Sequence, residues 1–538
     1  MRGIARRRLT SARGRSSFRA MIRTVLAAAL LASSIAGVAQ AQNTRSQSQS
    51  RATVVTEDPA ADPRMSIAQV QAIAPSTVQV LLERQRERWD KPPAGVPLLN
   101  AVIAWIPKVD FAALDADWRA GTSKGPLHGA PYFLKDNIEA GGPLPTTAGS
   151  LALAGNYTVR DAPIVARLNA AGAILLGKTN LSEWANIRGE HSSSGWSAVG
   201  GLTRNPFALD RTACGSSSGS AAAVAAGLAP FAIGTETDGS ITCPASVTGI
   251  VGLKPTVGLV SRTGIVPISS SQDTAGPMTL NVEDAAKVLS VIAGSDPADT
   301  ATKEADARKK DYFAGLDPNA LKGVKLAVMR WNTGYSRGTD AVFEEALATL
   351  RAAGAQIVDA PKIDEAPVNT AEHTVLFTEL KAGLNAYLAT SNALVKTRTL
   401  ADIIAFNDAN ASTELRWFGQ ESFIEAEATK GLADPAYLKA KADAKRLAGP
   451  EGIDRVLKAT GAVALIAPTG GPAWTIDMIN GDHFTGSAST LPAVAGYPHL
   501  TVPMGRVEGL PVGLSFIGPA WSEQLILSLG YAFQEARK

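Results

Sequence analysis

The chain contains few of the residues that most often build metal sites and serine–histidine hydrolases. Its 538 residues include only two cysteines and five histidines, with no close metal-ligand spacing among them. This argues against a structural zinc site. No histidine lies in a G-x-S-x-G context, so the nucleophile elbow of an α/β-hydrolase is not expected. A catalytic serine in this chain would need a different base.

Acidic residues are absent from the first 23 positions, which carry eight arginines: Arg2, Arg6, Arg7, Arg8, Arg13, Arg15, Arg19 and Arg23. An apolar run from Val25 to Val38 follows, and then Ala39-Gln40-Ala41. This order is typical of a secretory signal peptide, whereas a membrane anchor, the alternative, would need a longer apolar run. We therefore predict a signal peptide over 1–41, cleavage near Ala41, and a periplasmic or secreted protein. A start at Met21 would give a more compact signal peptide of the same kind.

The rest of the chain lacks both long apolar runs and an excess of positive charge. The formal charge is +3 for the whole sequence and becomes −5 when the eight arginines of the signal peptide are removed. We therefore predict neither nucleic-acid binding nor stable membrane insertion of the mature chain. Residues 42–64 are polar and without periodicity, which predicts a disordered leader. Nothing in the sequence indicates the oligomeric state.

The two cysteines, Cys214 and Cys243, lie in one stretch of small residues. Export would permit a disulfide between them, but the sequence does not give their distance. Cysteine in such surroundings often serves as a small buried apolar residue. We therefore expect two buried thiols and keep a disulfide as the alternative.

Short apolar runs alternate with helical periodicity from about residue 65 onward. This alternation predicts an α/β fold with one large domain over 65–538, in which helices cover both faces of a mixed, mostly parallel sheet. Residues of about 370–450 are rich in Ala, Leu, Glu and Lys and lack a strand pattern, so we predict a helical insertion that borders the substrate cleft. The predicted strands are 173–176, 231–234, 324–329, 356–358, 463–467, 500–503 and 512–517.

Gly, Ser, Ala and Thr dominate residues 214–256, which contain Ser216 and Ser240. Such small residues expose main-chain N–H groups, so the turn 235–240 could cradle an oxyanion. A phosphate loop is disfavoured because neither glycine-rich phosphate motif is present there, and a plain tight turn is the structural alternative. Upstream, Lys135 ends an apolar run that is typical of a buried strand, and burial lets a lysine act as a base. Together these residues predict a Ser-Ser-Lys acyl-transfer site.

Several blocks of the sequence resemble the amidase signature family. They are LKDN (134–137), GKTNLSEWAN (177–186), GSSSGSAAAVAAG (215–227), GTETDGS (234–240), GLKPT (252–256), SQDTAGPM (271–278), AVAGYPHLTVPMG (493–505) and GLPVGLSFIG (509–518). The resemblance spans about residues 65–538, and its central motif is long and specific. It implies the amidase-signature fold and amide hydrolysis through a seryl acyl-enzyme, with no metal or organic cofactor.

The resemblance also implies roles for individual residues. Ser240 matches the nucleophile, Lys135 the base, and Ser216 the bridging serine, whose peptide bond is cis in the family. Ser217 and Ser218 compete for the bridging role, but the family spacing of 24 positions before the nucleophile selects Ser216.

Further site residues follow from the same resemblance. Thr235 and Ser217 are expected to support the hydrogen-bond network. Asn180 and Trp184 are candidate substrate contacts, with packing as the alternative. The implied oxyanion donors are the main-chain N–H groups of Thr237, Asp238, Gly239 and Ser240.

Three departures from the commonest family pattern bear on the substrate. Cys214 and Asp238 stand where Gly is usual, and Thr242 where Arg is usual. These departures resemble the bacterial peptide amidase branch, whose members release ammonia from C-terminal peptide amides. We therefore expect an exported peptide amidase in which Asp238 contacts a peptide main chain. The alternatives are an amidase for aryl, fatty or amino-acid amides, an amidotransferase A-type subunit, and a non-catalytic binding protein.

Overall fold

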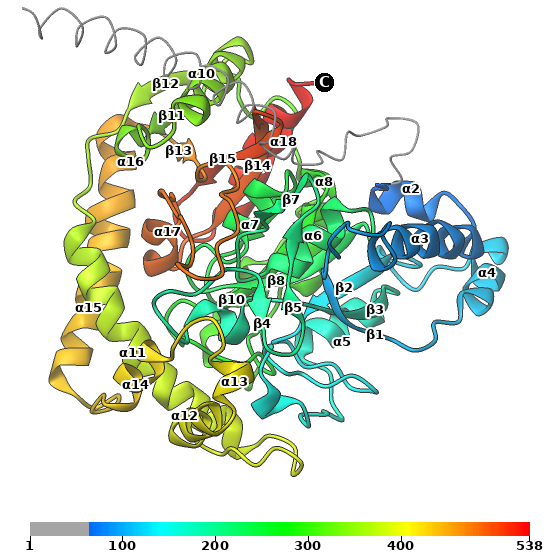
Figure 1. Ribbon diagram of the computed structural model, residues 1–538. Helices are drawn as coiled ribbons and strands as arrows, with labels where there is room; N and C mark the ends of the chain where they lie inside the picture. Colours follow the sequence, from blue (N-terminus) through cyan, green and yellow to red (C-terminus); the bar gives the residue numbers. More distant parts are fainter. Residues whose placement is uncertain (1–63) are drawn as a thin grey trace, which may run out of the picture. The chain divides into compact units, whose positions relative to one another are not determined.

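The computed structural model describes residues 64–538, and a single large sheet organises this part of the chain (Figure 1). The predicted signal peptide and nearly all of the predicted leader lie outside the described residues. The sheet has 11 strands in the spatial order β1-β3-β2-β8-β10-β9-β14-β15-β13-β11-β12. In this order the strands are β1 (Val102–Trp105), β3 (Ile174–Thr179), β2 (Pro131–Lys135), β8 (Phe231–Glu236), β10 (Thr274–Thr279), β9 (Val251–Lys254), β14 (His499–Val507), β15 (Leu510–Ile517), β13 (Ala464–Pro468), β11 (Lys325–Val328) and β12 (Gln356–Asp359).

Two short ladders and a set of helices complete the described part. The ladders pair β4 (Trp196–Ser197) with β5 (Gly201–Leu202), and β6 (Arg204–Asn205) with β7 (Ala208–Thr212). The helices are α2 (Ile67–Gln71), α3 (Pro75–Asp90), α4 (Phe111–Ala120), α5 (Pro163–Ala170), α6 (Ser218–Ala225), α7 (Thr242–Val247), α8 (Val282–Ile292), α9 (Ala305–Arg308), α10 (Arg337–Ala352), α11 (Ala366–Ala389), α12 (Leu400–Ala409), α13 (Ala411–Glu414), α14 (Glu421–Glu427), α15 (Pro435–Ala448), α16 (Arg455–Thr460), α17 (Thr490–Ala495) and α18 (Glu523–Glu535). Within residues 64–538, no helix combines the length and the apolar character that a membrane span requires.

The sheet is mixed, as predicted, but it is not mostly parallel. Parallel pairing joins β2 to β3 and β8, and joins β11 to β12 and β13. The other six of the ten neighbouring pairs are antiparallel. Alternation of strands and helices along a sequence does not reveal which strands become neighbours. The prediction of mostly parallel pairs was therefore wrong. The α/β class with a large mixed sheet is confirmed.

Helices cover both faces of the sheet, and β2 shows how its sequence divides between them. Tyr132 and Leu134 belong to a core shared with α5, α8 and α18, whereas Phe133 belongs to a second core shared with α6. Successive side chains of a strand point to opposite faces. Lys135, two residues after Phe133, therefore ends the strand on the α6 side of the sheet.

Between β12 and β13 the described chain contains helices and no strand. In Figure 1, α11 and α15 run side by side along one edge of the view. Lys441 and Tyr437 of α15 fix this pair, since Nζ and Oη lie 2.9 Å and 2.7 Å from Glu379 Oε1 of α11. This helical segment begins at Ala366, close to the start predicted from composition.

Gly219, in the first turn of α6, lies against the backbone next to β1 and β3. A Cβ at this position would lie 2.2 Å from Ala101 O and 2.5 Å from Asn180 O. We expect Gly219→Ala to lower the free energy of unfolding by about 1–3 kcal/mol, although alanine favours an isolated helix over glycine by about 1 kcal/mol. Chemical denaturation of the two proteins measures the difference. An unchanged or higher stability would contradict this close approach.

Candidate active site

Lys135 ends β2 inside the protein, and its amine meets oxygen atoms only. The residue is 0% exposed. Its Nζ lies 2.7 Å from Ser216 Oγ, 2.8 Å from Thr235 Oγ1 and 3.2 Å from Thr235 O. Asn137 Nδ2 donates to the same threonine hydroxyl at 3.0 Å, which fixes the orientation of Thr235. No carboxylate of the described residues lies within ion-pair distance of Lys135.

This environment changes the acidity of the lysine. Burial lowers the pKa of Lys135 to about 7, although the more distant carboxylates of Glu236 and Asp273 favour the charged form. A charged amine loses hydration when it is buried, and no adjacent anion compensates for the loss. Near neutral pH a large fraction of the Lys135 side chains is therefore uncharged and able to accept a proton.

Of the three consecutive serines, only Ser216 contacts the lysine. Its Oγ accepts the hydrogen bond from Lys135 Nζ, and the peptide bond between Gly215 and Ser216 is cis. Ser217 Oγ instead donates to Thr235 O at 3.0 Å and accepts from Thr235 N at 3.2 Å. Ser218 Oγ donates to Cys214 O. Ser217 and Ser218 therefore stabilise the local backbone, and Ser216 is the one of the three serines whose hydroxyl is hydrogen-bonded to Lys135.

The turn after β8 carries a row of unengaged main-chain donors. The N–H groups of residues 237–240 donate to no protein acceptor in the described part of the chain. Glu236 Oε2 accepts from Ile241 N at 2.7 Å and Thr242 N at 2.9 Å, and this fixes the start of α7. Thr237 Oγ1 donates to Asp273 Oδ1 at 2.6 Å, which fixes the other end of the turn. The arrangement leaves a rigid set of donors suited to an oxyanion.

Glycine is required within this turn, at Gly239. Its φ of +77° lies in the left-handed region, which side chains rarely adopt. A Cβ there would also lie 2.9 Å from Ser489 Oγ.

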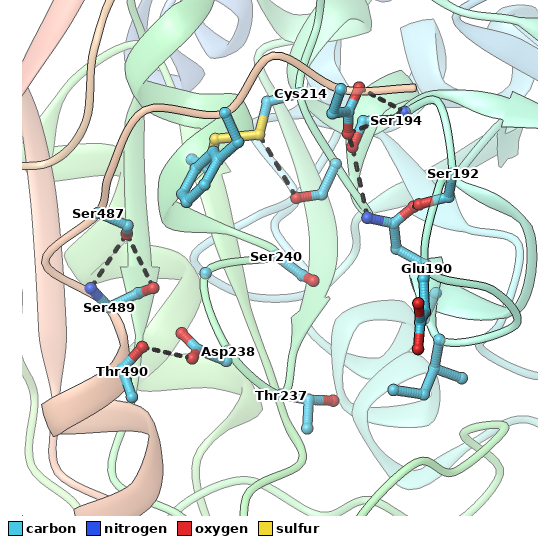
Figure 2. Close-up of a pocket in the computed structure, with 18 of the residues that line it drawn as sticks. Glu190, Ser192, Ser194, Cys214, Thr237, Asp238, Ser240, Ser487, Ser489 and Thr490 are labelled. Atoms are coloured by element: carbon cyan, nitrogen blue, oxygen red, sulfur yellow. Dashed lines mark hydrogen bonds between the residues drawn. A yellow bond between two sulfur atoms is a disulfide. The ribbon is translucent and has the colours of Figure 1, made fainter. Parts of the chain in front are cut away.

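Ser240 is the last residue of this turn and faces the cavity. Its main-chain oxygen accepts from Ser217 N at 3.1 Å, which joins the two serine-bearing segments. Within residues 64–538, its hydroxyl makes no hydrogen bond with Ser216 or with another side chain. The hydroxyl is therefore available to a ligand, and it lies at the cavity (Figure 2). Lys135 and Ser216 do not line that cavity, so a ligand would meet Ser240 first.

The cavity has a volume of about 450 Å³. Its acidic lining residues are Glu190, Asp238 and Asp482, and no lysine or arginine of the described chain lines it. Apolar groups, among them Trp474 and Phe484, form another part of the wall. In the view of Figure 2, Ser240 lies between Asp238 and Glu190. Such a cavity is large enough to hold the acyl part of a small or peptide-like ligand.

Asp238 is the acidic residue within the turn of residues 237–240, the candidate oxyanion turn. Its Oδ2 accepts from Thr490 Oγ1 at 2.8 Å, whereas its buried Oδ1 has no partner in the described structure. Burial raises the pKa of Asp238. Burial, together with the negative charge of Asp238, also raises the pKa of Glu372 to about 8. Glu372 is linked to the turn through Gln272, whose Nε2 lies 2.8 Å from Glu372 Oε1 and 3.3 Å from Thr237 O.

Two candidate substrate contacts lie away from the cavity. Asn180 is fully buried, and its Nδ2 donates to Gly201 O and Thr203 Oγ1, both at 3.0 Å. Its Oδ1 accepts from Ser197 Oγ at 2.6 Å. These hydrogen bonds engage the side-chain amide of Asn180 with protein partners. The expectation that Asn180 binds substrate is therefore corrected. Trp184 likewise packs against Phe423, with ring centroids 5.7 Å apart.

The expectation of two free thiols is wrong. Cys214 and Cys243 form a disulfide with a Cα–Cα distance of 6.0 Å, and both residues line the cavity. The loop before α6 passes beside the first turn of α7, and this proximity is not visible in a sequence separation of 29.

Sequence reasoning missed the segment that closes one side of the cavity, residues 474–490. Asp482 fixes this segment, because its Oδ1 accepts from Ser194 N at 3.0 Å and from Trp474 Nε1 at 3.2 Å. The segment carries no motif that would identify it. Glu236, by contrast, lies within the GTETDGS block, where its position four residues before Ser240 could have indicated a cap for α7.

Comparison with known proteins identifies relatives of this chain. A family model described as Amidase matches residues 97–527. A probable amidase of Arabidopsis thaliana is 37% identical over 455 residues, which cover 82% of this chain and 83% of the relative. The A-type subunit of a glutamyl-tRNA(Gln) amidotransferase from Symbiobacterium thermophilum is 38% identical over 441 residues, which cover 79% of this chain and 86% of the relative.

Solved structures extend the likeness to three dimensions. The native peptide amidase of Stenotrophomonas maltophilia is 50% identical and superposes with a TM-score of 0.82, covering 88% of this chain and 97% of its own. The peptide amidase PAM in complex with the competitive inhibitor chymostatin is 51% identical over the same shares of the two chains, with a TM-score of 0.83. The chain therefore belongs to the amidase signature family of amide-hydrolysing enzymes.

Proposed function

We propose that this chain is an exported amidase that hydrolyses carboxamides, and C-terminal peptide amides in particular, to a carboxylate and ammonia. The observation that carries the proposal is the buried Lys135 amine, which lies 2.7 Å from the hydroxyl of Ser216 and has a pKa lowered to about 7. An uncharged amine at a serine hydroxyl, beside a turn of unengaged N–H groups, has the parts that acyl transfer requires.

Acylation begins with a proton relay. Neutral Lys135 takes the proton of the Ser216 hydroxyl, and Ser216 takes the proton of the Ser240 hydroxyl. Ser240 Oγ then forms a bond to the carbonyl carbon of the amide. The negative charge that develops on the carbonyl oxygen is stabilised by the main-chain N–H groups of residues 237–240, each typically worth about 3–4 kcal/mol.

Collapse of this intermediate breaks the C–N bond. The proton held by Lys135 returns through Ser216 to the leaving nitrogen, so that ammonia departs neutral. Water, deprotonated by the same relay, attacks the acyl-enzyme, and the proton held by Lys135 returns through Ser216 to Ser240 Oγ as the ester bond breaks. The carboxylic acid that is released then loses its proton to ammonia or to solvent and becomes the carboxylate. These steps balance in atoms and charge without a metal or organic cofactor, and we propose that none is used.

The substrate class is supported by two observations. The likeness to peptide amidase structures is the stronger one, at 50% and 51% identity. The cavity of about 450 Å³ beside Ser240 gives room for a peptide acyl group. The amidotransferase relative at 38% identity supports a second candidate, an ammonia-supplying amidotransferase subunit. Release of ammonia only from glutamine would favour that second candidate.

The proposal of export rests on the N-terminal sequence. A basic start, a short apolar run and an A-x-A site at residues 39–41 are typical of a cleaved signal peptide. The mature chain would then act in the periplasm or outside the cell, on small amides or peptides, without nucleic acid and without a membrane anchor.

Replacement of the nucleophile tests the chemistry. We expect Ser240→Ala to lower kcat for ammonia release by at least about 10⁴-fold, because the variant lacks the hydroxyl that forms the acyl-enzyme in the proposed relay. Ser290→Ala, a serine in α8 remote from the cavity, is the matched control and is expected to keep the parental rate. Substantial turnover by folded Ser240→Ala protein would refute the assignment.

The pH profile tests the base. Lys135 acts when uncharged, and its uncharged fraction increases as pH rises through its pKa of about 7. We therefore expect kcat/KM to rise about tenfold per pH unit below that value and to level off above it. Lys135→Met is expected to abolish nearly all activity and, with it, the rise of kcat/KM with pH. A profile that stays flat through neutral pH would contradict a lysine base.

A substrate panel tests the acyl specificity. We expect kcat/KM for an N-acetylated dipeptide amide to exceed the values for a free amino-acid amide, an aryl amide and a fatty amide by at least about tenfold. Initial rates of ammonia release provide the comparison. A preference for the aryl or fatty amide would refute the peptide-amide assignment and leave the proposed mechanism standing.

A further inference from the structure

The single disulfide of this protein joins the two segments that carry the serines of the proposed relay. Cys214 stands two residues before Ser216, and Cys243 stands three residues after Ser240. The chain contains no other cysteine. The only covalent cross-link therefore lies at the point where the bridging serine and the nucleophile must be aligned.

Direct hydrogen bonds join these segments on one side of Ser240 only. Before the oxyanion turn, Ser217 Oγ and the backbone of Thr235 exchange two hydrogen bonds, at 3.0 Å and 3.2 Å. At Ser240 itself, the main-chain oxygen accepts from Ser217 N. After Ser240, no hydrogen bond joins the first turn of α7 to residues 213–216 within the described structure. On that side the disulfide is the direct bond between the two segments, and it is accompanied by packing against Val247 and by Asn205 Nδ2, which donates to both Thr212 O and Val247 O.

Cys214 is poorly placed to keep its position without the bond. Its φ of +54° lies in the left-handed region, which costs a non-glycine residue conformational energy and persists only where the surroundings impose it. Its main-chain groups bond within its own segment, N–H to Thr212 Oγ1 at 2.9 Å and O from Ser218 Oγ. These bonds do not fix Cys214 relative to α7.

The disulfide is also part of the cavity wall. Both cysteines line the cavity, and Figure 2 shows the bonded sulfurs near Ser240. They pack in a small cluster with Val247, Ala473 and Trp474. A small thiol that enters the cavity can therefore reach the bond, and a bound substrate or inhibitor covers it.

We propose that the Cys214–Cys243 disulfide is a positioning group for acyl transfer at Ser240, so that reduction of this bond switches the enzyme to a slow form. The inference rests on the proposed function of Ser240. A dithiol reductant gives two electrons and two protons to the bond, which becomes two thiols, and the reductant becomes a disulfide. Two non-bonded sulfurs need more separation than bonded ones, so Cys214, and with it Ser216 two residues later, moves relative to Ser240.

The expected loss of rate follows from how sensitive a proton relay is to the position of its groups. A misplacement of about 1 Å in a catalytic group can cost about 10²-fold in rate. Substrate binding is affected less, because other parts of the cavity wall, such as Ile268 and Leu376, belong to a different apolar cluster from the two cysteines. The disulfide should therefore act on kcat more than on KM.

The test compares the oxidised protein with the same protein reduced by dithiothreitol, with thiol titration to count the free cysteines. We expect kcat for a peptide amide to fall at least about tenfold in the reduced protein, with a smaller change in KM, and to recover after reoxidation. Turnover is expressed per folded molecule, with folding measured by circular dichroism and thermal unfolding. A competitive inhibitor in the cavity should slow the reduction.

The double variant Cys214→Ala, Cys243→Ala is the matched control. It should have the low kcat of the reduced protein, and dithiothreitol should not change its rate, because the chain has no other cysteine. Equal kcat for oxidised protein and for protein with two titrated thiols would overturn the proposal, as would a double variant with the parental kcat. A loss of thermal stability with an unchanged kcat per folded molecule would also overturn it. If the oxidised protein releases no ammonia from any amide, the proposed function itself fails.

Discussion

Burial of the Lys135 amine among hydroxyl and carbonyl oxygens, without a carboxylate beside it, is the interaction on which the rest of the site depends. The neighbouring strand gives a contrast. Lys178 of β3 is equally buried, but its Nζ lies 3.0 Å from Asp136 Oδ1. A carboxylate at that distance stabilises the charged amine, so Lys178 is suited to a structural ion pair. The two lysines differ in their partners, and this difference separates the proposed proton acceptor from a structural cation.

The oxyanion turn likewise combines main-chain N–H groups that have a protein acceptor with N–H groups that have none. Glu236 takes the N–H groups of Ile241 and Thr242, which begin α7. The four N–H groups before them have no protein acceptor in the described chain and point to no competing partner. A turn that engaged these donors internally would be more stable and less useful, because an oxyanion would first have to displace the internal acceptors. The carboxylate of Glu236 therefore fixes the turn without using the groups that a substrate needs.

Local sequence was sufficient for the parts of this site that lie within short motifs. The apolar run before Lys135 predicted a buried strand, and the small residues around Ser216 and Ser240 predicted close backbone contact. Long-range pairing was not predictable in the same way. The antiparallel neighbours of β8 and β9, the approach of Cys214 to Cys243, and the segment held by Asp482 all depend on three-dimensional proximity between distant parts of the chain. Asn180 is an error of another kind. A polar residue after a strand was expected to bind substrate, but its side-chain amide makes hydrogen bonds within the protein.

The acidic lining of the cavity has a consequence for the end of the reaction cycle. Hydrolysis converts an uncharged amide into an anion, and this anion forms beside Glu190, Asp238 and Asp482, with no lysine or arginine among the described lining residues. Like charges in a cavity of lowered dielectric repel each other. We therefore expect the site to hold the uncharged amide better than the acid derived from it. Product inhibition should then be weak, and resynthesis of the amide from the acid should be disfavoured at the binding step.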